Sequence, residues 1–429
     1  MTQAGLDDLW AGRLASGARQ MTSSAIRDLL KVTEQPEMIS FAGGLPAPEC
    51  FPAEELALAA ERVLATQAAR ALQYGPTEGY PPLRALVAAL MRERGLPATP
   101  DQVLITNGSQ QALDMIGKLL IDPGDPVLVE DPTYVGALQA WRPYRPRFVA
   151  LPLDEAGLRI DALERALEDL GRVGQRPKFL YLVSCFQNPT GVTLAADRRA
   201  ALIALAARHA LPVIEDDPYG ELRYSEAALP ALAALDAARW GALRHVVYLS
   251  TFSKVLAPGL RVGWVLAPTP LQQQLVQAKQ GLDLHSGSLA QAIAYEACRD
   301  GLLARQIARI RRVYCARRDA MLRALERTMP PGVDWTEPDG GMFLWVRLPP
   351  ALDAGELLQR ALERNVAFVP GAAFYANGGG AQTLRLNFSH ATPARIEEGI
   401  ARLAEAIADL QAVAASVNRA ARPRRRRGR

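Results

Sequence analysis

Long apolar runs and paired cysteines are both missing from this chain of 429 residues. No stretch approaches the roughly 20 consecutive apolar residues that a membrane-spanning helix needs, so we expect no membrane partner. The first 20 residues lack a basic segment followed by an apolar core, which argues against a secretory signal. The cysteines are scattered and form no C-x-x-C pair: Cys50, Cys185, Cys298 and Cys315. This pattern argues against a metal site or a disulfide framework and predicts a cytoplasmic protein.

An excess of positive charge is missing from the body of the chain. The formal net charge is +4, but seven arginines and no acidic residue lie between Arg419 and Arg429, which leaves the body near −3. That balance argues against a basic nucleic-acid-binding surface. We expect the tail, ARPRRRRGR, to be a disordered and solvated end, with a weak contact to a polyanion as the alternative.

The chain does contain enough apolar sequence for a large core. It is 49% hydrophobic and 22% charged, and its length suits two or three domains. We find no internal repeat. Short, continuous and β-branched apolar runs recur, as expected for strands that are buried on both faces: 126–130, 178–183, 211–217, 245–250 and 261–268.

Helical patterns separate several of these runs. Residues 109–120 and 197–210 have helical spacing, and the alternation of strand and helix predicts a mostly parallel α/β sheet. The runs 245–250 and 261–268 have no helix between them, so we expect that pair to be antiparallel. From about residue 290 the pattern changes to a long Arg-rich helix, roughly 302–328, followed by a smaller α+β unit.

Polar residues cluster where the apolar runs end. LITNGSQQ (104–111) predicts a strand, a tight glycine turn and a helix start, where Ser109 can cap the helix and the free N–H groups suit an anion. Tyr134 follows the next strand, either as packing or as a stacking platform. The Asn-Pro-Thr-Gly turn at 188–191 is explained by turn chemistry alone.

Three consecutive carboxylates end another buried run, in EDDPYGEL (215–222). Acidic side chains there are costly unless a cation pairs with them. The alternative for Glu215 and Asp217 is helix capping.

One lysine stands among small and hydroxyl residues in STFSKVLAPGLRVGW (250–264), with Arg261 seven positions after Lys254. A lone lysine at a strand end is usually a surface residue. The other interpretation is a lysine that forms a Schiff base, because a desolvated amine loses its proton more easily. The order of the motifs favours the second, because the carboxyl ends of strands in a doubly wound sheet meet at one crevice. The groups that would meet there suit a phosphorylated, cationic aromatic ring held covalently by a lysine.

These motifs together resemble the fold-type I pyridoxal-phosphate aminotransferases of class I/II, and within them the 2-aminoadipate and kynurenine branch. The resemblance covers nearly all of residues 20–410 and is carried by ISFAGGLPAPECFP, QYGPTEGYPPLR, FQNPTG, EDDPYGEL, FSKVLAPGLRVG, AKQGLDLH, GGMFLWV and LRLNFS. It implies a large domain with a mostly parallel seven-stranded sheet flanked by helices. It also implies a smaller α+β domain built from the C-terminal part and the N-terminal segment.

The resemblance also implies domain limits and a cofactor, pyridoxal 5′-phosphate. We expect an N-terminal segment with a mobile helix over 1–45, a large cofactor-binding domain over 46–290, a small domain over 291–415 and the tail over 416–429. The catalytic residues would be Lys254, which forms the Schiff base and moves the Cα proton, with Asp216 and Tyr219. We select Asp216 rather than Asp217 because the family spacing is Asp-x-x-Tyr.

Further residues would bind the cofactor. Asn188 and Tyr219 would contact the ring oxygen, and Tyr134 would stack on the ring. The phosphate would be bound by Ser109, Gln110, Thr251, Ser253 and Arg261, with Thr251 standing where the family usually has serine. Tyr74 would reach the site of a neighbouring subunit, which implies a homodimer with shared active sites.

The substrate residues implied by the resemblance are Arg385, Gly44, Ser24 and Arg27, with Tyr74 and Asn188. Arg385 would bind the α-carboxylate, and the alternative is a strand arginine in a salt bridge. Gly44 would allow a close backbone approach. Ser24 and Arg27, three residues apart on the mobile helix, would meet a distal carboxylate, whereas the alternative for Arg27 is a solvated helix arginine.

The implied activity is transamination between an L-amino acid and 2-oxoglutarate, with 2-aminoadipate-like acids, glutamate and a broad range of other amino acids as donors. Two alternatives stay open. One is a lyase or decarboxylase on the same fold. The other is a non-enzymatic regulator, against which we note that only about forty residues precede the FAGGLP motif, too few for a winged-helix module.

Overall fold

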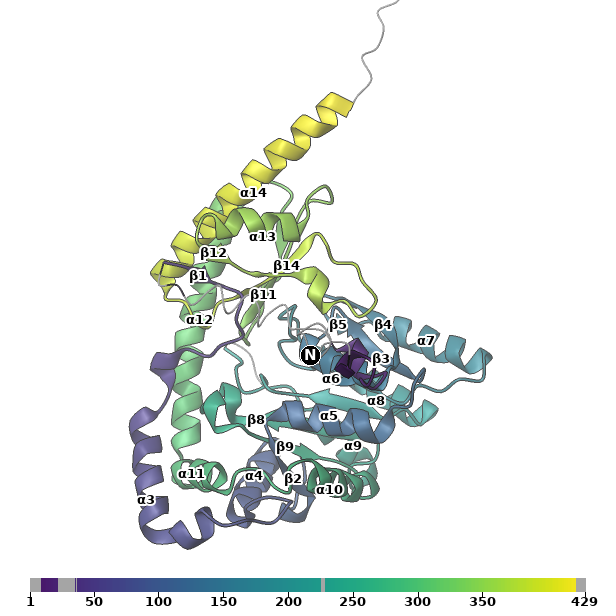
Figure 1. Cartoon of the computed structure of the whole chain (residues 1–429), viewed down its shortest axis with the longest axis vertical. Helices are drawn as coiled ribbons and strands as arrows, with labels where there is room; N and C mark the ends of the chain where they lie inside the picture. The colour runs from purple at the N-terminus through teal and green to yellow at the C-terminus, as the bar shows by residue number, and fades with distance from the viewer. Residues whose placement is uncertain (1–8, 22–34, 36, 225–227, 422–429) are drawn as a thin grey trace, which may run out of the picture.

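The computed structural model describes residues 9–21, 35, 37–224 and 228–421. Two groups of strands lie at different heights in Figure 1, with helices around both. Among the described helices, none is both long and apolar enough to cross a membrane.

The larger sheet has the strand order β2-β9-β8-β7-β6-β3-β4-β5. All its pairs are parallel except those of β9 with β2 and β8 and that of β4 with β5. The expected antiparallel pair is therefore confirmed. The strands are β2 (Val103–Asn107), β3 (Pro126–Asp131), β4 (Arg147–Asp154), β5 (Gly157–Leu158), β6 (Leu180–Leu182), β7 (Val213–Asp216), β8 (Val246–Thr251) and β9 (Val262–Leu266).

Within the described residues this sheet has eight strands rather than the expected seven, because a two-residue strand, β5, folds back on β4. Gly157 adopts φ +91°, and the Asp154 carboxylate accepts a hydrogen bond from the Ala156 N–H at 2.9 Å, so the turn closes tightly. The central strands β7, β8 and β9 are buried along their whole length. Burial on both faces explains why their sequences are continuous rather than alternating.

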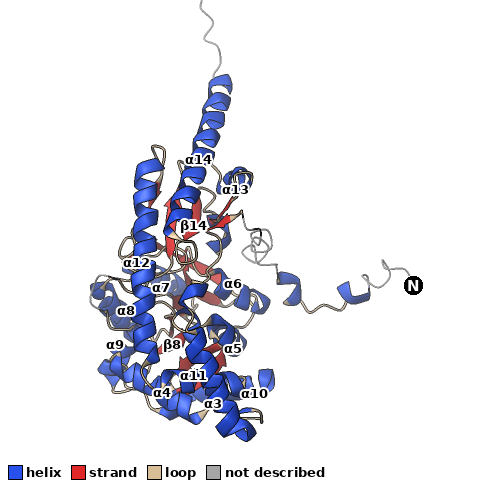
Figure 2. Cartoon of the chain, turned by 90° about the vertical axis from the view of Figure 1, so that its left-hand side faces the viewer, coloured by secondary structure: helices blue, strands red, loops and turns tan. Residues whose placement is uncertain are grey.

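Helices flank the large sheet and surround its strands in Figure 2. Helix α5 packs against α6 and α10, α8 packs against α7 and α9, and α11 packs against α3 and α4. Their bounds are α3 (Ala53–Ala71), α4 (Pro81–Glu93), α5 (Ser109–Leu120), α6 (Val135–Trp141), α7 (Ile160–Arg172), α8 (Ala196–His209), α9 (Leu232–Trp240), α10 (Thr269–Asp283) and α11 (Ser288–Cys298). The predicted helices over 109–120 and 197–210 are α5 and α8.

The smaller unit is built around the antiparallel sheet β10-β11-β14-β13. The N-terminal segment joins it, because β1 pairs in parallel with β12. Helix α12 confirms the expected long helix; it contacts α11 at one end and packs along α14, which links the two units (Figure 1). The bounds are β1 (Ile39–Ser40), β10 (Asp334–Trp335), β11 (Phe343–Arg347), β12 (Val366–Ala367), β13 (Val369–Pro370), β14 (Thr383–Asn387), α12 (Leu302–Thr328), α13 (Ala354–Leu362) and α14 (Pro393–Ala421).

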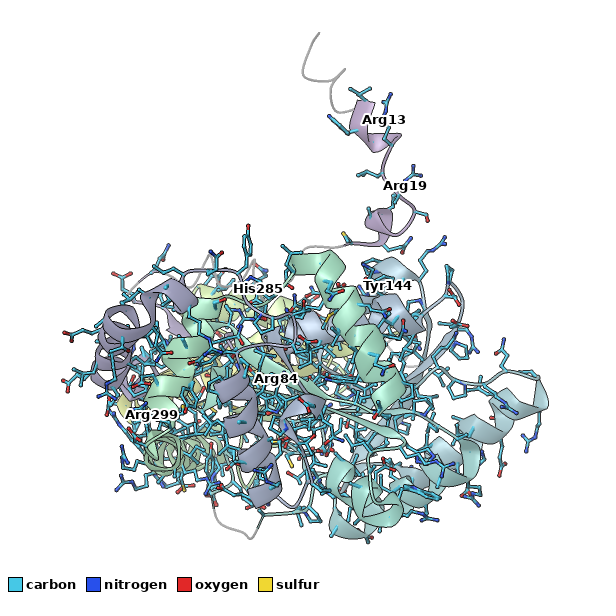
Figure 3. All side chains as sticks on the ribbon, turned by 90° about the horizontal axis from the view of Figure 1, so that it is seen from below. Arg13, Arg19, Arg84, Tyr144, His285 and Arg299 are labelled. Atoms are coloured by element: carbon cyan, nitrogen blue, oxygen red, sulfur yellow. The ribbon has the colours of Figure 1, made fainter. Side chains whose placement is uncertain are left out.

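The described part of the N-terminal segment, residues 9–21, projects from the body (Figure 3). Its 3₁₀ helix η1 (Ala18–Gln20) contacts η4 (Arg142–Tyr144) at the edge of the large unit. A side chain at Gly17 would collide with the Pro143 carbonyl, so this contact requires glycine.

Candidate active site

A pocket of about 640 Å³ lies at the carboxyl ends of the parallel strands, where residues of both units meet. It brings together most of the residues singled out from the sequence: Gly44, Ser109, Gln110, Tyr134, Asn188, Asp216, Tyr219, Thr251, Ser253, Lys254, Arg261 and Arg385. Crevices at this edge of an open α/β sheet are where such folds bind ligands.

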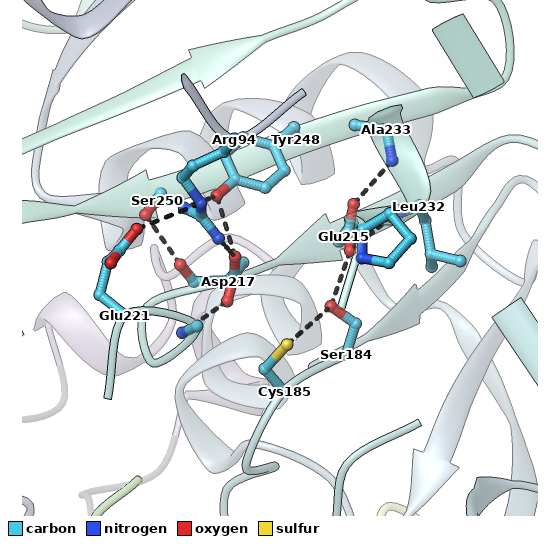
Figure 4. Close-up of polar contacts among 12 residues, drawn as sticks. Arg94, Ser184, Cys185, Glu215, Asp217, Glu221, Leu232, Ala233, Tyr248 and Ser250 are labelled. Atoms are coloured by element: carbon cyan, nitrogen blue, oxygen red, sulfur yellow. Dashed lines mark hydrogen bonds and ion pairs between the residues drawn. The ribbon is translucent and has the colours of Figure 1, made fainter. Parts of the chain in front are cut away.

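The three consecutive carboxylates at the end of β7 lie in three different environments. Glu215 accepts hydrogen bonds from the N–H groups of Leu232 and Ala233 at 2.9 Å and so caps α9, as the alternative interpretation proposed (Figure 4). Asp217 binds the Arg94 guanidinium and the Tyr248 hydroxyl outside the pocket. Asp216 alone lines the pocket.

Asp216 carries an unused acceptor. Its Oδ2 accepts a hydrogen bond from the Tyr181 hydroxyl at 3.0 Å, while its buried Oδ1 has no partner among the described residues. Burial raises the pKa of Asp216 to about 7, and the negative charge of Asp217 adds to this, against the Tyr181 hydrogen bond. A cationic donor that reaches Oδ1 would satisfy this atom and restore the ionised form.

Lys254 ends the short 3₁₀ helix η5 (Phe252–Lys254), which directly follows β8. Its Nζ donates a hydrogen bond to the Gly44 carbonyl at 2.9 Å. Burial lowers the pKa of Lys254 to about 8, and the positive charges of Arg385 and Arg261 lower it further. The amine is therefore prepared to act as a nucleophile or a base near neutral pH.

The start of α5 and the loop after η5 form the other end of the pocket. Ser109 is the first helical residue and does not cap the helix: Gly108 occupies the cap position, with φ +70° and no side-chain cap. A side chain at Gly263 of β9 would lie 2.8 Å from the Ser109 nitrogen, so glycine lets the helix start approach the strand. Arg261 is exposed beside the Asn107 carbonyl, and the N–H groups of the first turn lack helical acceptors.

The hydroxyl pair predicted for this end is in place. Thr251 Oγ1 accepts a hydrogen bond from the Ser253 N–H at 3.1 Å and lies 2.9 Å from Ser253 Oγ. Gln110 donates its side-chain amide to the Gly136 carbonyl at 2.8 Å. Together with Arg261 and the helix start, these groups provide the donors that a phosphate needs.

Arg385, on β14, is a buried cation that pairs with no carboxylate of the described residues. It is 1% exposed; its Nη1 donates to Asn188 Oδ1 at 2.8 Å and its Nη2 to the Ala42 carbonyl at 2.6 Å. Its Nε has no partner, and no salt bridge involving Arg385 occurs within the described residues. Burial lowers the pKa of Arg385 to about 10, partly opposed by Tyr219 and Tyr134. The expected alternative, a strand arginine in a salt bridge, does not hold here.

Tyr219, Asn188 and Tyr134 surround the space between Lys254 and Arg385. The Tyr219 hydroxyl hydrogen-bonds Asn188, and burial raises the pKa of Tyr219 well above its ordinary value. Gly44 also has little room, because a side chain there would lie 3.2 Å from the Phe343 ring.

Tyr74 is not among the residues that line this pocket. Tyr74 is 78% exposed, meets His285 edge to face with ring centroids 5.8 Å apart, and lines a different hollow. Ser24 and Arg27 lie outside the described residues.

Two further contributions were missed from the sequence. Tyr181 supports Asp216 from the neighbouring strand, and a tyrosine inside a buried apolar run was a usable signal, because its hydroxyl must find a partner. Phe343 and Phe374 hold the Arg385 guanidinium, with ring centroids 4.3 and 5.1 Å from its carbon. No local sequence signal pairs these distant residues.

The family comparison agrees with this geometry. Residues 38–403 match the model of the family described as aminotransferase class I and II. The chain belongs to this family. It is 49% identical over 404 residues to the 2-aminoadipate transaminase of Thermus thermophilus, which covers 94% of this chain and 98% of that one. It is 47% identical over 388 residues to aromatic-amino-acid aminotransferase 1 of Thermococcus litoralis, covering 90% and 92%.

A solved structure supports the same assignment. The α-aminoadipate aminotransferase LysN of Thermus thermophilus, complexed with N-(5′-phosphopyridoxyl)-L-leucine, matches with a TM-score of 0.88 at 48% identity, over 94% of this chain and 99% of that one. The chain is a pyridoxal-phosphate-dependent aminotransferase. The pocket fits this cofactor, because one cavity is lined by the unpartnered acceptor Asp216 Oδ1, by the Lys254 amine and by the hydrogen-bond donors around Arg261.

Proposed function

We propose that this aminotransferase moves the amino group of 2-aminoadipate, glutamate and a broad range of other L-amino acids to 2-oxoglutarate. The observation that carries the proposal is Arg385, a fully buried guanidinium that faces the Lys254 pocket and has no carboxylate partner in the part of the chain that the structure describes. A substrate α-carboxylate supplies the missing anion in a bidentate pair. The acidic and aromatic substrates named for the two relatives support a broad range.

In this proposal Asp216, Lys254 and Arg261 hold the cofactor. Asp216 Oδ1 would accept a hydrogen bond from the protonated ring nitrogen, and Lys254 would provide the covalent attachment. Arg261 would bind the phosphate together with Ser109, Gln110, Thr251 and Ser253. The bound cofactor supplies an electron-withdrawing ring that stabilises negative charge at the substrate Cα. Tyr134 would cover the ring, and Asn188 and Tyr219 would contact its oxygen.

Lys254 then carries the proton. With the cofactor and the substrate bound, the free Nζ of Lys254 would accept the proton from the substrate Cα and would deliver it to a carbon of the cofactor. Its lowered pKa, about 8, leaves a useful fraction of the amine neutral near pH 7. Gly44, whose carbonyl accepts a hydrogen bond from Nζ, holds the amine toward the pocket.

The decisive experiment is a panel of amino acids with 2-oxoglutarate, read as kcat/KM with product analysis. We expect equal amounts of glutamate and of the 2-oxo acid from each donor, with 2-aminoadipate among the best. Carbon dioxide or ammonia in place of the 2-oxo acid would indicate a decarboxylase or lyase. An absence of turnover with every donor would favour a non-enzymatic regulator, and a mobility-shift assay with DNA tests that outcome.

To explain how the enzyme selects among substrate side chains, we propose that Ser24 and Arg27 bind the distal carboxylate of an acidic substrate. If so, Arg27→Ala should weaken the binding of 2-aminoadipate and 2-oxoglutarate by about 1–3 kcal/mol, which raises their KM roughly 5- to 150-fold. The KM for leucine should rise much less. Arg19→Ala, nearby on the same segment, serves as the control. Equal losses on both substrate types would remove the assignment.

We also propose a homodimer in which Tyr74 completes the partner's site. In support, Tyr74 is exposed and lies away from the pocket of its own chain. Mixing Lys254→Ala with Tyr74→Ala protein should form some dimers with one intact site, so activity should exceed that of either variant alone. No gain after subunit exchange would contradict shared sites.

A cytoplasmic location is proposed as well. All four cysteines are free thiols in the structure, which suits a reducing compartment. Cell fractionation followed by immunodetection tests it.

A further inference from the structure

A charged cluster lies just outside the pocket, around the buried carboxylate of Asp217, with Arg94 and Glu221 partly exposed. The Asp217 carboxylate is 2% exposed and binds the Arg94 guanidinium, while its Oδ2 also accepts the Tyr248 hydroxyl at 3.0 Å (Figure 4). Arg94 Nη1 meets the same hydroxyl at 2.6 Å. Arg94 also pairs with Glu221 at 3.3 Å, so three polar partners hold this one side chain.

This cluster holds the turn that carries Tyr219. Asp217 Oδ1 accepts the Gly220 N–H at 2.8 Å and closes the turn 217–220, and the Asp217 carbonyl accepts the Ser250 hydroxyl at 2.8 Å. A side chain at Gly220 would lie 2.6 Å from both carboxylate oxygens and 2.7 Å from Arg94, so the turn and the ion pair fit closely. The residue before Asp217 is Asp216, and the second residue after it is Tyr219; both line the pocket.

The cluster also determines the charge next to Asp216. Asp217 raises the pKa of Asp216, while Arg94, by its charge and hydrogen bond, overcomes burial and lowers the pKa of Asp217. The pair is therefore an ionised carboxylate and its counterion. The other titratable or charged groups that act on Asp217 or are influenced by it are Tyr248, Glu215, Asp216, Arg199 and Cys185, with Glu221 bound to Arg94.

We propose that Arg94 is a positioning residue of the active site: it holds the turn 217–220, thereby places Asp216 and Tyr219 against the cofactor, and neutralises the charge of Asp217 beside Asp216. This inference rests on the proposed roles of Asp216 and Tyr219. Arg94 itself does not line the pocket and acts through Asp217. Helix α4, which ends just before Arg94, is thus tied to the chemistry from outside the pocket.

The test compares Arg94→Gln, Asp217→Asn and the double variant as cofactor-loaded protein, with Arg92→Gln as the matched control. Arg92 lies two residues earlier and donates only to the Ala98 carbonyl, at 2.7 Å. The readouts are the pH midpoint of the bound cofactor's visible absorbance, the cofactor dissociation constant of the apoprotein, and kcat and KM for glutamate.

The two single variants should move the pH midpoint in opposite directions. Removing the Arg94 charge leaves the negative charge of Asp217 without its counterion. That negative charge stabilises the protonated form at the Lys254 end of the cofactor, so the midpoint should rise by about 0.5–1 pH unit. Asp217→Asn should lower it, and the double variant should return near the wild-type value. For Arg94→Gln we expect kcat to fall by about 10- to 100-fold with a smaller change in KM, and the cofactor to bind more weakly.

A merely structural role predicts other results. Midpoints that move in the same direction, or that do not move while only the melting temperature falls, would overturn the inference. If Arg94→Gln does not fold, Arg94→Lys, which keeps the charge, should retain the wild-type midpoint, and Asp217→Asn should still lower it; the reverse in either overturns the inference. Asp216→Asn in the same titration distinguishes a failure of this inference from a failure of the proposed function. An unchanged midpoint in that variant would refute the proposed role of Asp216 itself.

Discussion

Arg385→Met should remove most of the activity while leaving the folded apoprotein about as stable as the wild type. Arg385 is buried, and its charge has no carboxylate partner within the described residues. It is held only by neutral acceptors, Asn188 and the Ala42 carbonyl, and by two aromatic rings. A side chain arranged in this way costs folding free energy that substrate binding recovers.

The sizes of the opposing contributions follow from these contacts. Lowering the pKa of Arg385 from 12.5 to about 10 corresponds to roughly 3 kcal/mol of burial cost at neutral pH, where the guanidinium is charged in both the folded and the unfolded chain. Methionine removes that cost but loses two hydrogen bonds of about 1 kcal/mol each. It also loses ring contacts of about 0.5–1 kcal/mol each, partly replaced by its own apolar packing. The free energy of unfolding should therefore stay within about 2 kcal/mol of the wild type.

Catalysis should respond much more strongly. Loss of a buried bidentate pair with the α-carboxylate costs about 3–5 kcal/mol, which is a fall in kcat/KM of roughly 150- to 5,000-fold. The assay is steady-state kinetics with glutamate and with leucine, together with urea unfolding of the apoprotein. Arg347→Met, on the neighbouring strand β11 and exposed, is the control and should change neither. A fall in kcat/KM of less than tenfold, or a loss of more than about 4 kcal/mol in unfolding, would show that Arg385 is a structural arginine.

Four further outcomes are expected. Lys254→Ala should lose the borohydride-stable cofactor adduct and lower the turnover rate by several orders of magnitude; near-native turnover would refute its role. In the apoprotein, the reaction of Lys254 with an amine-specific reagent should have its midpoint near pH 8, and a midpoint near pH 10.5 would contradict the desolvation of this amine. The free energy of unfolding should rise between pH 8 and 10.5, because in that range the unfolded chain keeps a proton that the folded chain has released. Asp216→Asn should retain the cofactor but transaminate far more slowly than Asp217→Asn, and the reverse order would show that the register of the motif is wrong. Gly263→Ala should weaken cofactor binding by about tenfold or more, because the added carbon would lie 2.8 Å from the backbone of the α5 start; unchanged affinity in a dialysis assay would mean that the helix start does not bind the phosphate.

Much of the scaffold was predictable because it is encoded locally. The buried strands are continuous apolar runs, and the missing helix between β8 and β9 revealed their antiparallel pairing. Helices α5 and α12 begin and end at the expected residues. The extra strand β5 was missed, since two residues folded back by a glycine carry too little pattern to be recognised.

The active site likewise contains features that the sequence predicted and features that it did not. Motif order placed Lys254 and Asp216 together, because strand ends of one sheet converge whatever the details of packing. The expected cap at Ser109 was wrong, because a glycine with φ +70° occupies the cap position and brings the helix start close to β9. The distance between the start of α5 and β9 depends on how β2, β9 and α5 pack together, which no local pattern encodes.

The sequence by itself therefore determined the residue types, their order along the strands and the family to which they belong. Tertiary structure alone decided that Glu215 caps a helix, that Asp216 faces the pocket and that Asp217 binds Arg94 outside the pocket. It also decided that Arg385 meets only neutral acceptors among the described residues, which no motif reveals. The physical reason is that the neighbours of a charged group set its solvation, its pKa and the ligand it can bind, and here those neighbours lie from 17 to 343 residues away along the chain.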